Sequence, residues 1–335
     1  MSNRDPALSV IVPARNAEAL LDRALSVWRG PGRGDLELIV VDDASTDGTA
    51  AAAARYADRV LRLGGQRGPA AARNAGARAG RGDILLFVDA DVRAPSGVAD
   101  LVVRAFREDP GLDAVFGSYD DRPAEGNFLS QFKNLIHHYV HQNADEEAGT
   151  FWAGCGAVRK EAFLEVGGFS EAYARPSIED VEFGYRLKAL GKTIRLLKSL
   201  QVTHLKRWTI AGLLRSDIAG RAIPWTRLAC ERGLPRDLNF RLSDRLSSVL
   251  AWLFPIGLAA GAWRPSGLIL AAAAALLILL INRPLYRFFR EKRGLLFTAG
   301  AILWHWFYLL YASAVFVLWA PVCLVRKLFG RNISS

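Results

Sequence analysis

The sequence predicts an α/β protein with a doubly wound sheet of buried parallel strands, followed by hydrophobic helices. Two observations support this fold class. Short apolar runs alternate with helical patterns up to about residue 200, which is typical of a sheet with helices packed on it. Long apolar stretches then begin near residue 246. A chain of 335 residues exceeds a typical single domain, so two structural units are expected.

The strands and helices can be placed in order along the chain. Residues 8–12 and 36–41 are apolar runs typical of buried strands, and residues 18–28 between them carry apolar side chains at helical spacing. The remaining expected elements are an Ala-rich helix at 49–57, strands at 60–63, 84–88 and 114–117, and helices at 70–79, 97–108, 128–141, 160–166 and 180–190. This alternation predicts the doubly wound sheet.

Polar clusters follow three of these strands directly, at residues 13–16, 42–47 and 89–91. In sheets of this kind, ligands bind outside the carboxyl ends of the strands, where loops and helix N-termini converge. The sequence therefore predicts a binding site that is built from three loops at one edge of the sheet.

The third cluster, Asp89-Ala90-Asp91, follows the apolar run 84–88. Two carboxylates separated by one residue at a strand end can converge on one cation. Hard oxygen ligands suit Mg²⁺ or Mn²⁺ bridging a diphosphate, whose leaving-group charge the metal neutralises. The same pattern is common on solvated loops, and the buried strand before it favours the metal site here.

The second cluster, residues 42–49, has two interpretations. Asp, Ser and Thr cap helices well, so Thr46 or Asp47 is expected to cap the Ala-rich helix. The carboxylate pair Asp42 and Asp43 exceeds what capping needs, and a carboxylate there can accept a hydrogen bond from a base N–H or from ribose hydroxyls. Both interpretations can hold together.

Three motifs, in their order and spacing, resemble glycosyltransferase family 2, whose catalytic domain has the GT-A fold. They are VIVPARN from Val10, VVDDASTDGT from Val40 and AARNAGARAGRGDILLFVDADV from Ala71. The resemblance covers about residues 7–210. It implies a nucleotide-sugar site with Pro13, Arg15, Asp42 and Asp43 around the nucleoside, Arg73 near the nucleotide, and Asp89 with Asp91 at the metal and diphosphate.

The resemblance also implies roles in the second half of this domain. Asp180 would be the catalytic base, which deprotonates the acceptor hydroxyl so that it attacks the anomeric carbon opposite the nucleotide and inverts the configuration. Glu179-Asp180 otherwise fits an acidic helix N-terminus favoured by the helix dipole. Residues 152–156 resemble the acceptor-side loop, where Trp152 and Gly154 would receive the acceptor, with Glu179 on the same side.

His204 is expected either as a third metal ligand beside Asp89 and Asp91, as the resemblance implies, or as a structural histidine. Lys206-Arg207-Trp208 resembles a weaker form of the family's Gln-x-x-Arg-Trp segment, with His204 where Gln would stand. That departure, together with the small number of membrane helices, disfavours processive polysaccharide synthesis.

The last third of the chain carries apolar stretches at residues 246–263, 266–281 and 295–325. The first two have about the length needed to cross a bilayer, and the third is long enough for one tilted span or a bent pair. Buried core helices are the alternative, which the absence of a polar face in residues 271–281 disfavours. The expected organisation is a GT-A domain at 1–210, amphipathic or interfacial helices at 211–245, and a membrane region at 246–335 with two to three transmembrane segments.

Charge divides the chain in the same way. Residues 1–194 carry 23 Lys and Arg against 28 Asp and Glu, whereas residues 195–335 carry 20 against 5. Basic residues beside apolar helices are attracted to anionic headgroups and favour the cytosolic side. Nucleic-acid binding is disfavoured because these residues lie beside Leu, Phe and Trp runs and form no isolated polar patch.

The cysteines and the N-terminal residues indicate the compartment. Three cysteines without metal-ligand spacing predict neither a zinc site nor a disulfide framework. The first residues lack the apolar stretch of a signal peptide. We therefore expect the catalytic domain in the cytosol. The apolar stretches predict a multi-pass protein of the inner (plasma) membrane, and the Ala- and Arg-rich composition with few lysines is compatible with a bacterial source.

The expected function is an inverting, metal-dependent hexosyltransferase that moves one sugar from a UDP- or GDP-sugar to a lipid or lipid-linked acceptor at the cytosolic membrane face. One alternative is a soluble or polysaccharide acceptor, with the membrane part as an anchor only. Another is a binding or scaffold protein that keeps the fold without the chemistry. Dinucleotide oxidoreduction is disfavoured because no Gly-x-Gly-x-x-Gly follows the first strand.

Overall fold

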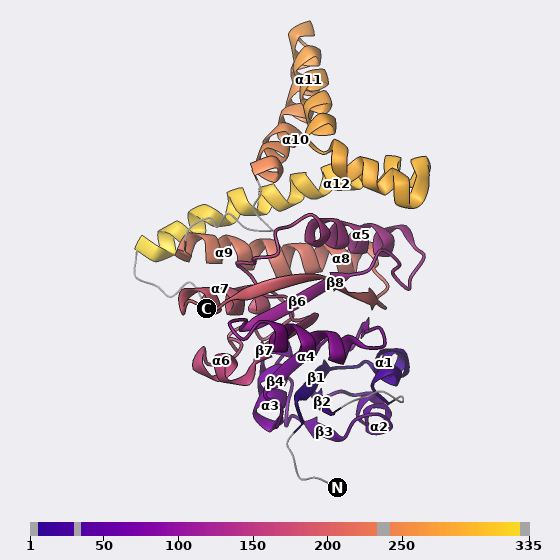
Figure 1. Cartoon of the computed structure of the whole chain (residues 1–335). Helices are drawn as coiled ribbons and strands as arrows, with labels where there is room; N and C mark the ends of the chain where they lie inside the picture. Colours follow the sequence, from indigo (N-terminus) through magenta and orange to yellow (C-terminus); the bar gives the residue numbers. More distant parts are fainter. Residues whose placement is uncertain (1–5, 30–34, 233–241, 329–335) are drawn as a thin grey trace. The chain divides into compact units, whose positions relative to one another are not determined.

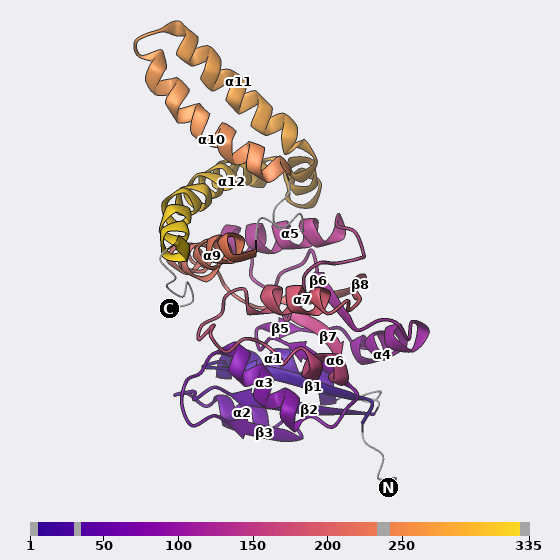
Figure 2. The same ribbon diagram turned by 90° about the vertical axis from the view of Figure 1, so that its left-hand side faces the viewer.

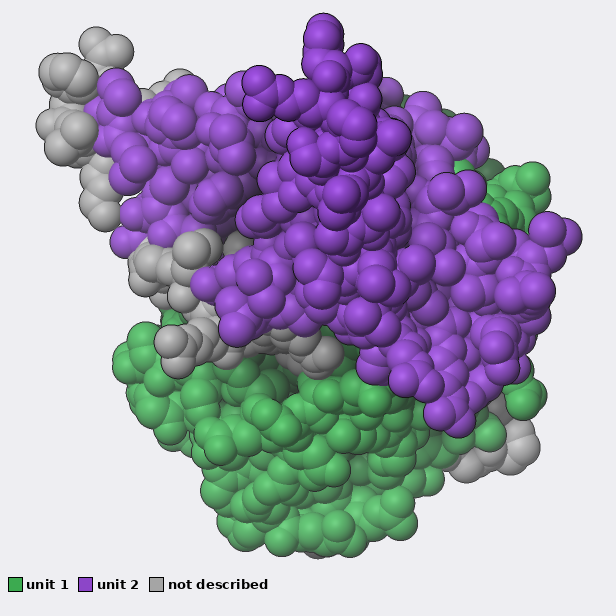
Figure 3. Space-filling view, turned by 90° about the horizontal axis from the view of Figure 1, so that it is seen from above, with its two compact units in different colours: residues 1–208 green, residues 209–335 purple. Residues whose placement is uncertain are grey.

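The computed structural model describes residues 6–29, 35–232 and 242–328. The chain divides into two compact units, Met1–Trp208 and Thr209–Ser335, which Figure 3 shows in green and purple. The first unit contains the sheet, and the described residues of the second unit are largely helical (Figure 1).

The described residues of the first unit form an eight-stranded sheet with the order β3-β2-β1-β4-β7-β6-β8-β5. The strands are β1 Leu8–Ala14, β2 Leu36–Asp42, β3 Arg59–Arg62, β4 Ile84–Val88, β5 Val92–Arg93, β6 Ala114–Tyr119, β7 Cys155–Arg159 and β8 Ile194–His204. Strand β1 runs parallel to β2 and β4, whereas β7 runs antiparallel to β4 and β6. The predicted α/β class is confirmed, but the sheet is mixed and not wholly parallel.

Helices accompany the strands in sequence (Figures 1 and 2). They are α1 Glu18–Leu25, the 3₁₀ helix η1 Ser26–Arg29, α2 Thr49–Ala54, α3 Pro69–Ala79, α4 Val98–Glu108, α5 Phe128–Gln142, α6 Lys160–Glu165 and α7 Glu179–Ala189. Each helix expected from the sequence of this unit is present, with ends shifted by a few residues.

Strand β1 shows why both faces of the sheet are covered. Successive side chains of a strand point to opposite faces. Val10 and Val12 join the main core cluster together with Leu21 of α1. On the other face, a Cβ added to Gly76 of α3 would lie 2.4 Å from Cγ2 of Ile11. Helix α3 therefore packs very closely on the sheet at this point.

The glycine-rich segment at 153–156 was expected as a turn or loop, and this was wrong for its second half. Cys155 begins β7, which is inserted between β4 and β6. A Cβ at Gly156 would lie 2.4 Å from the carbonyl oxygen of Trp152. The small residues permit this close backbone approach, but they carry no alternating apolar pattern from which a strand could be recognised.

The second unit contains α8 Ile210–Asp217, the π-helix η2 Ile218–Ala222, α9 Ile223–Arg232, α10 Leu242–Gly261, α11 Pro265–Ile281 and α12 Arg283–Leu328. Helices α10 and α11 form a hairpin with small residues at their contact. A Cβ at Gly257 would lie 2.7 Å from the N atom of Ala271, and one at Gly267 would lie 2.3 Å from the N atom of Gly261. The two backbones therefore approach closely along this hairpin.

Helix α12 joins the basic segment after α11 to the last apolar stretch. Gly294 interrupts it with φ 80° and ψ −179°. Within the second unit, the Tyr311 hydroxyl of α12 donates to Oδ2 of Asp217 at 2.7 Å. The Arg227 guanidinium lies 5.6 Å from the centroid of the Trp319 ring. Helix α12 is thus tied to α8 and α9 through polar and cation–π contacts.

The expectation of two to three transmembrane segments is not supported. Among the described helices, one is long and apolar enough to cross a membrane, over Arg283–Val325. Helix α11 is apolar but has 17 residues, and α10 contains Asp244, Arg245 and Pro255. Because of its length and composition, α12 is the candidate span.

Candidate active site

The loops after β1, β2 and β4 meet at one edge of the sheet, as the carboxyl ends of parallel strands must. Ala14 of β1 pairs with Asp42 of β2, and the N–H of Asp43 donates to the carbonyl of Ala14 at 2.9 Å. Asp89 follows β4 directly. The polar clusters of the three strands therefore share this edge.

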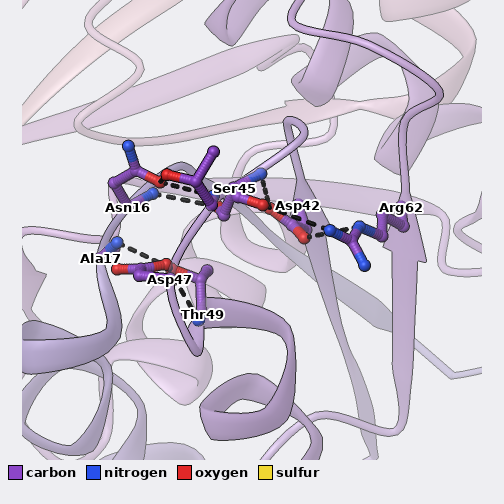
Figure 4. Close-up of polar contacts among 8 residues, drawn as sticks. Asn16, Ala17, Asp42, Ser45, Asp47, Thr49 and Arg62 are labelled. Carbon is purple, nitrogen blue, oxygen red and sulfur yellow. Dashed lines mark hydrogen bonds and ion pairs between the residues drawn. The ribbon is translucent and has the colours of Figure 1, made fainter.

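The first two loops are joined by hydrogen bonds (Figure 4). The side-chain oxygen of Asn16 accepts from the N–H of Thr46 at 2.9 Å, and the N–H of Asn16 donates to Oγ of Ser45 at 3.0 Å. Asn16 and Ala44 both have left-handed backbones, with φ 47° and 54°. That conformation costs an L-residue about 1–2 kcal/mol, and the hydrogen bonds between the loops offset part of this cost.

The start of α2 completes this arrangement. Oδ1 of Asp47 accepts from the N–H of Thr49 at 3.1 Å, and Oγ1 of Thr49 accepts from the N–H of Ala17 at 2.8 Å. The cap position of α2 is Gly48, so the expectation of a cap at Thr46 or Asp47 was wrong; Asp47 stands one residue earlier and accepts from the first N–H of the helix. The same contacts tie α2 to the first loop.

Asp42 is fully buried at the end of β2. Its Oδ1 accepts from the N–H of Ser45 at 2.9 Å. Its Oδ2 accepts no hydrogen bond from the described residues and lies 3.4 Å from Nε of Arg62. An unfilled acceptor on a buried carboxylate costs free energy unless a ligand or water donates to it. The guanidinium of Arg62 offsets part of this cost through the ion pair.

Asp43 has a different local role. Its two carboxylate oxygens accept from the N–H groups of Arg67 and Gly68, at 2.7 and 2.9 Å. It thereby holds the loop that leads into α3. Pro13 is half-buried within β1, and Arg15 is exposed on the loop that follows.

Arg73 of α3 joins two acidic residues that lie far apart in the sequence. Its Nη1 donates to Oε1 of Glu179 at 2.8 Å, and its Nη2 donates to Oδ1 of Asp89 at 2.7 Å. Only 4% of Arg73 is exposed. Burial alone would lower the pKa of Arg73, but Asp89 and Glu179 raise it above its ordinary value. The guanidinium therefore stays charged and links the end of β4 to the start of α7.

Asp180 lies beside this link, in the first turn of α7. Its Oδ2 accepts from the N–H of Ala153 at 3.1 Å, while the carbonyl of Gly154 accepts from the N–H of Asp89 at 3.2 Å. Residues 153–154 thus connect the two acidic segments a second time. Burial and the carboxylate of Glu179 raise the pKa of Asp180 to about 6. A carboxylate with this pKa is ionised at neutral pH and remains basic enough to take a proton.

Asp91 faces two cationic or basic side chains from the end of β8. Its Oδ2 lies 3.7 Å from Nε2 of His204 and 4.0 Å from Nζ of Lys206. Burial raises the pKa of Asp91, but His204 and Lys206 outweigh this and hold it below its ordinary value. Asp91 is therefore a persistent carboxylate.

The residues at this point fit a divalent cation in part. Two donors of one ion, each about 2.1 Å from it, lie roughly 3–4.2 Å apart depending on the angle between them, and the 3.7 Å between Asp91 and His204 falls in that range. Asp89 is engaged with Arg73. No group of three or more His, Cys, Asp or Glu side chains suited to a metal ion occurs within the described ranges. The structure therefore brings two of the three expected ligands, Asp91 and His204, together, while Arg73 holds the third, Asp89.

Aromatic rings lie on the expected acceptor side. The centroid of the Trp152 ring is 4.9 Å from that of Tyr119 and 4.7 Å from that of His137. Tyr119 in turn stacks on His204 at 4.2 Å. A Cβ at Gly154 would lie 2.3 Å from Cζ2 of Trp152. Gly154 is therefore needed for the position of the indole itself.

Sequence reasoning did not place Tyr119 near these residues, and it placed Lys206 in a motif-like segment without a role. The register of β6 against β8 shifts between Phe116 and Ser118, and a Cβ at Gly117 would lie 2.0 Å from the carbonyl oxygen of Leu200. The irregularity precedes Tyr119. A glycine inside a strand pattern is a recognised sign of a bulge, so Gly117 was the available signal.

Comparison with known proteins identifies the fold and the family. Residues 9–167 match the model of glycosyl transferase family 2. These residues form a family 2 glycosyltransferase domain. The GT-A fold is confirmed by a mannosyltransferase from Pyrobaculum calidifontis, solved with GDP-Man and Mn²⁺, with a TM-score of 0.60 and 23% identity over 90% of this chain and 88% of that one.

Two relatives extend the comparison of the glycosyltransferase domain. Validoxylamine A glucosyltransferase of Streptomyces hygroscopicus subsp. limoneus is 30% identical over 226 residues, which cover 56% of this chain and 49% of that protein. Dolichyl-phosphate beta-glucosyltransferase of Dictyostelium discoideum is 25% identical over 261 residues, which cover 68% and 70%. The chain spans about half the length of the first curated relatives it matches.

Proposed function

We propose that the protein is an inverting glycosyltransferase that moves one hexose from a UDP- or GDP-sugar to a lipid or lipid-linked acceptor. The observation that carries this proposal is the Arg73 bridge, which joins Asp89 of the diphosphate side to Glu179, the neighbour of Asp180. It supports a site in which a general base and a diphosphate-binding strand end face the same reacting carbon.

In this proposal each group has one task. Asp42 accepts a hydrogen bond from the base of the donor, and Asp43 keeps the loop before α3 in place. Asp180 takes the proton of the acceptor hydroxyl as the new glycosidic bond forms and the bond to the diphosphate breaks. Trp152 offers an aromatic face to the acceptor or its sugar.

A divalent cation, Mg²⁺ or Mn²⁺, would be held by Asp91 and His204, with Asp89 close by. When bound, it would neutralise negative charge on the diphosphate leaving group. Chelation with EDTA should then remove most turnover, and added Mn²⁺ or Mg²⁺ should restore it; unchanged turnover in excess chelator would exclude this role.

The apolar surface of the second unit supports the proposal of a lipid or lipid-linked acceptor. Large hydrophobic side chains are exposed along it, including Trp263 at 82% and Leu296 at 90%. A relative that is named as acting on dolichyl phosphate supports a lipid-linked acceptor. We place the protein at the inner membrane, with the glycosyltransferase unit in the cytosol, because the second unit carries most of the basic excess.

The test is release of UDP or GDP from a panel of nucleotide sugars, with a bacterial lipid extract as the acceptor source. We expect one donor to turn over only when extract is present, and transfer of label into the organic phase. Wild-type protein that binds no nucleotide sugar in a thermal-shift screen would instead point to the scaffold alternative.

A second candidate is transfer to a soluble or polysaccharide acceptor, which the similarity to a validoxylamine A glucosyltransferase favours. A chain that ends near residue 240 separates the two functions. If it folds and keeps full turnover with an aqueous acceptor, the membrane part is an anchor only.

A further inference from the structure

Residues 205–208, which follow β8, make three hydrogen bonds with other described residues of the first unit. The N–H of Leu205 donates to the carbonyl of Asp91 at 2.8 Å, and the N–H of Trp208 donates to Oγ of Ser130 at 2.8 Å. The side-chain amide of Asn127 donates to the carbonyl of Trp208 at 2.9 Å. Because both ends are tied down, the backbone directions of the residues between them are determined.

Those two residues, Lys206 and Arg207, are adjacent cations with different partners. Nζ of Lys206 lies 4.0 Å from Oδ2 of Asp91 and 4.3 Å from the centroid of the Trp208 ring. Nη1 of Arg207 lies 3.4 Å from Oε2 of Glu125. The Lys206 side chain is 45% exposed and therefore accessible to a ligand. Lys206 therefore lies near the carboxylate of Asp91, whereas Arg207 is paired with Glu125 on a different loop.

We propose that Lys206, and not Arg207, binds the β-phosphate of the nucleotide sugar and neutralises the charge that develops there as the sugar leaves. The assignment rests on the proposed function and identifies a residue that contacts the leaving group.

The charge balance of the transfer explains why a cation is needed at this position. The acceptor oxygen forms the new bond to the anomeric carbon and gives its proton to Asp180. The electron pair of the breaking bond goes to the β-phosphate oxygen, so the nucleoside diphosphate leaves with one more negative charge than it carried in the donor. A cation that binds the product charge more strongly than the donor lowers the barrier.

Lysine is suited to this task at this site. Its ammonium is a compact charge with three donors on a flexible stem, so it can follow the phosphate as the bond breaks. The face of Trp208 favours a cation at this position. If Asp91 held a metal ion, the flexible stem of Lys206 would still let its ammonium reach a phosphate.

The experiment compares two matched variants of the full-length protein, Lys206→Met and Arg207→Met, by titration calorimetry. Each diphosphate is compared with its monophosphate, UDP with UMP and GDP with GMP. Every titration is done once in Mg²⁺ and once in Mn²⁺. For the nucleotide that the wild type binds, we expect Lys206→Met to weaken the diphosphate by roughly ten- to a hundredfold, the usual loss of one charge-assisted hydrogen bond. The monophosphate should bind as before, and Arg207→Met should change both affinities less than about threefold. Lys206→Arg should restore part of the diphosphate affinity.

Three results would overturn the assignment. Equal weakening of monophosphate and diphosphate by Lys206→Met would show that Lys206 only supports the fold around Asp91. A larger diphosphate loss in Arg207→Met would transfer the role to Arg207, and unchanged affinities in Lys206→Met would remove it. If the wild type binds no nucleotide at all, the proposed function itself fails, which is a distinct outcome. Melting temperatures of the unliganded variants provide the folding control.

Discussion

At the scale of single residues, the site depends on one buried guanidinium placed between acids from two distant segments. Arg73 contacts Asp89 and Glu179 at ordinary hydrogen-bond distances. Glu179 is as buried as Arg73, with 5% of each side chain exposed. A buried charge costs free energy unless an opposite charge pairs with it. Removing the Arg73 guanidinium would therefore leave the carboxylates of both Asp89 and Glu179 without their ion-pair partner.

We therefore expect Arg73→Gln to lower the free energy of unfolding by about 3–5 kcal/mol, the usual result of leaving a buried charge unpaired. Urea unfolding followed by circular dichroism measures this. Arg78→Gln on the same helix is the matched control, because Arg78 is exposed. Equal stability of the two variants would contradict the bridge.

The pH dependence of the reaction follows from Asp180. Its pKa is raised to about 6 by burial and by Glu179, and only the ionised form can accept a proton. We expect kcat/KM to rise with pH through about pH 6 and then level off.

Asp180→Asn should lower kcat by about a hundred- to ten-thousandfold and abolish that rise, because the amide cannot act as a base. The pH profile of both proteins, with donor and acceptor at fixed concentrations, measures this. Normal turnover by the variant would exclude Asp180 as the base.

At the scale of elements, the loop that leads into α3 is determined by one glycine. Gly68 has φ +90°, and a Cβ there would lie 2.6 Å from the carbonyl oxygen of Ala174. Its N–H donates to Asp43. The start of α3, which positions Arg73, therefore depends on this residue.

Gly68→Ala should destabilise the protein by about 1–3 kcal/mol, the range for strain at a special backbone conformation, and should weaken nucleotide binding as well. Gly65→Ala serves as the control, since nothing lies within 4 Å of a Cβ at that position. Thermal unfolding with and without nucleotide compares the two variants.

The α10–α11 hairpin depends on small residues in the same way. Any side chain at Gly257 would meet the backbone of Ala271 and Gly267, at 2.7 and 2.9 Å from its Cβ. We expect Gly257→Val to lower the melting temperature of the detergent-solubilised protein, since overpacking costs about 1–3 kcal/mol. Ala272→Val, at an exposed position of α11, should have little effect. Matching melting curves would show that the hairpin is not close-packed.

At the scale of the whole molecule, the basic residues in excess and most of the exposed large apolar side chains lie in the last third of the chain. The exposed large hydrophobic side chains concentrate in the second unit, for example Leu295 at 73% and Leu303 at 71%. Many large apolar side chains exposed in one unit are typical of a surface that contacts lipid or a partner.

We expect the expressed protein to remain in the membrane pellet after washing with 1 M NaCl and to be released by detergent. At this salt concentration the Debye length is about 3 Å, so attractions between exposed charges and headgroups are screened. If only the basic residues bound the protein to the membrane surface, high salt would release it. Recovery of the full-length protein in the salt wash would show that electrostatic contacts, and not α12, hold it at the bilayer.

Much of the first unit could be predicted from patterns along the chain. The period of the apolar residues located β1, β2, β4 and helices from α1 to α7 within a few residues, because burial on one or both faces dictates that period. The antiparallel strand β7 was missed because its small residues show no such period. The last apolar stretch was expected to begin at residue 295, and the structure agrees in that a non-helical Gly294 separates it from the basic first part of α12.

The amino-acid sequence by itself determined the α/β class, the family and the order of the acidic motifs, since these depend on local periods and on residues close together in the chain. Only the tertiary structure decided which charges are partners. Arg73 meets Glu179 across 106 positions, Asp43 holds a loop, and Lys206 turns toward Asp91 while Arg207 turns away. Hydrogen bonds and ion pairs depend on the distance between two side chains in space, and that distance cannot be read from their separation along the chain.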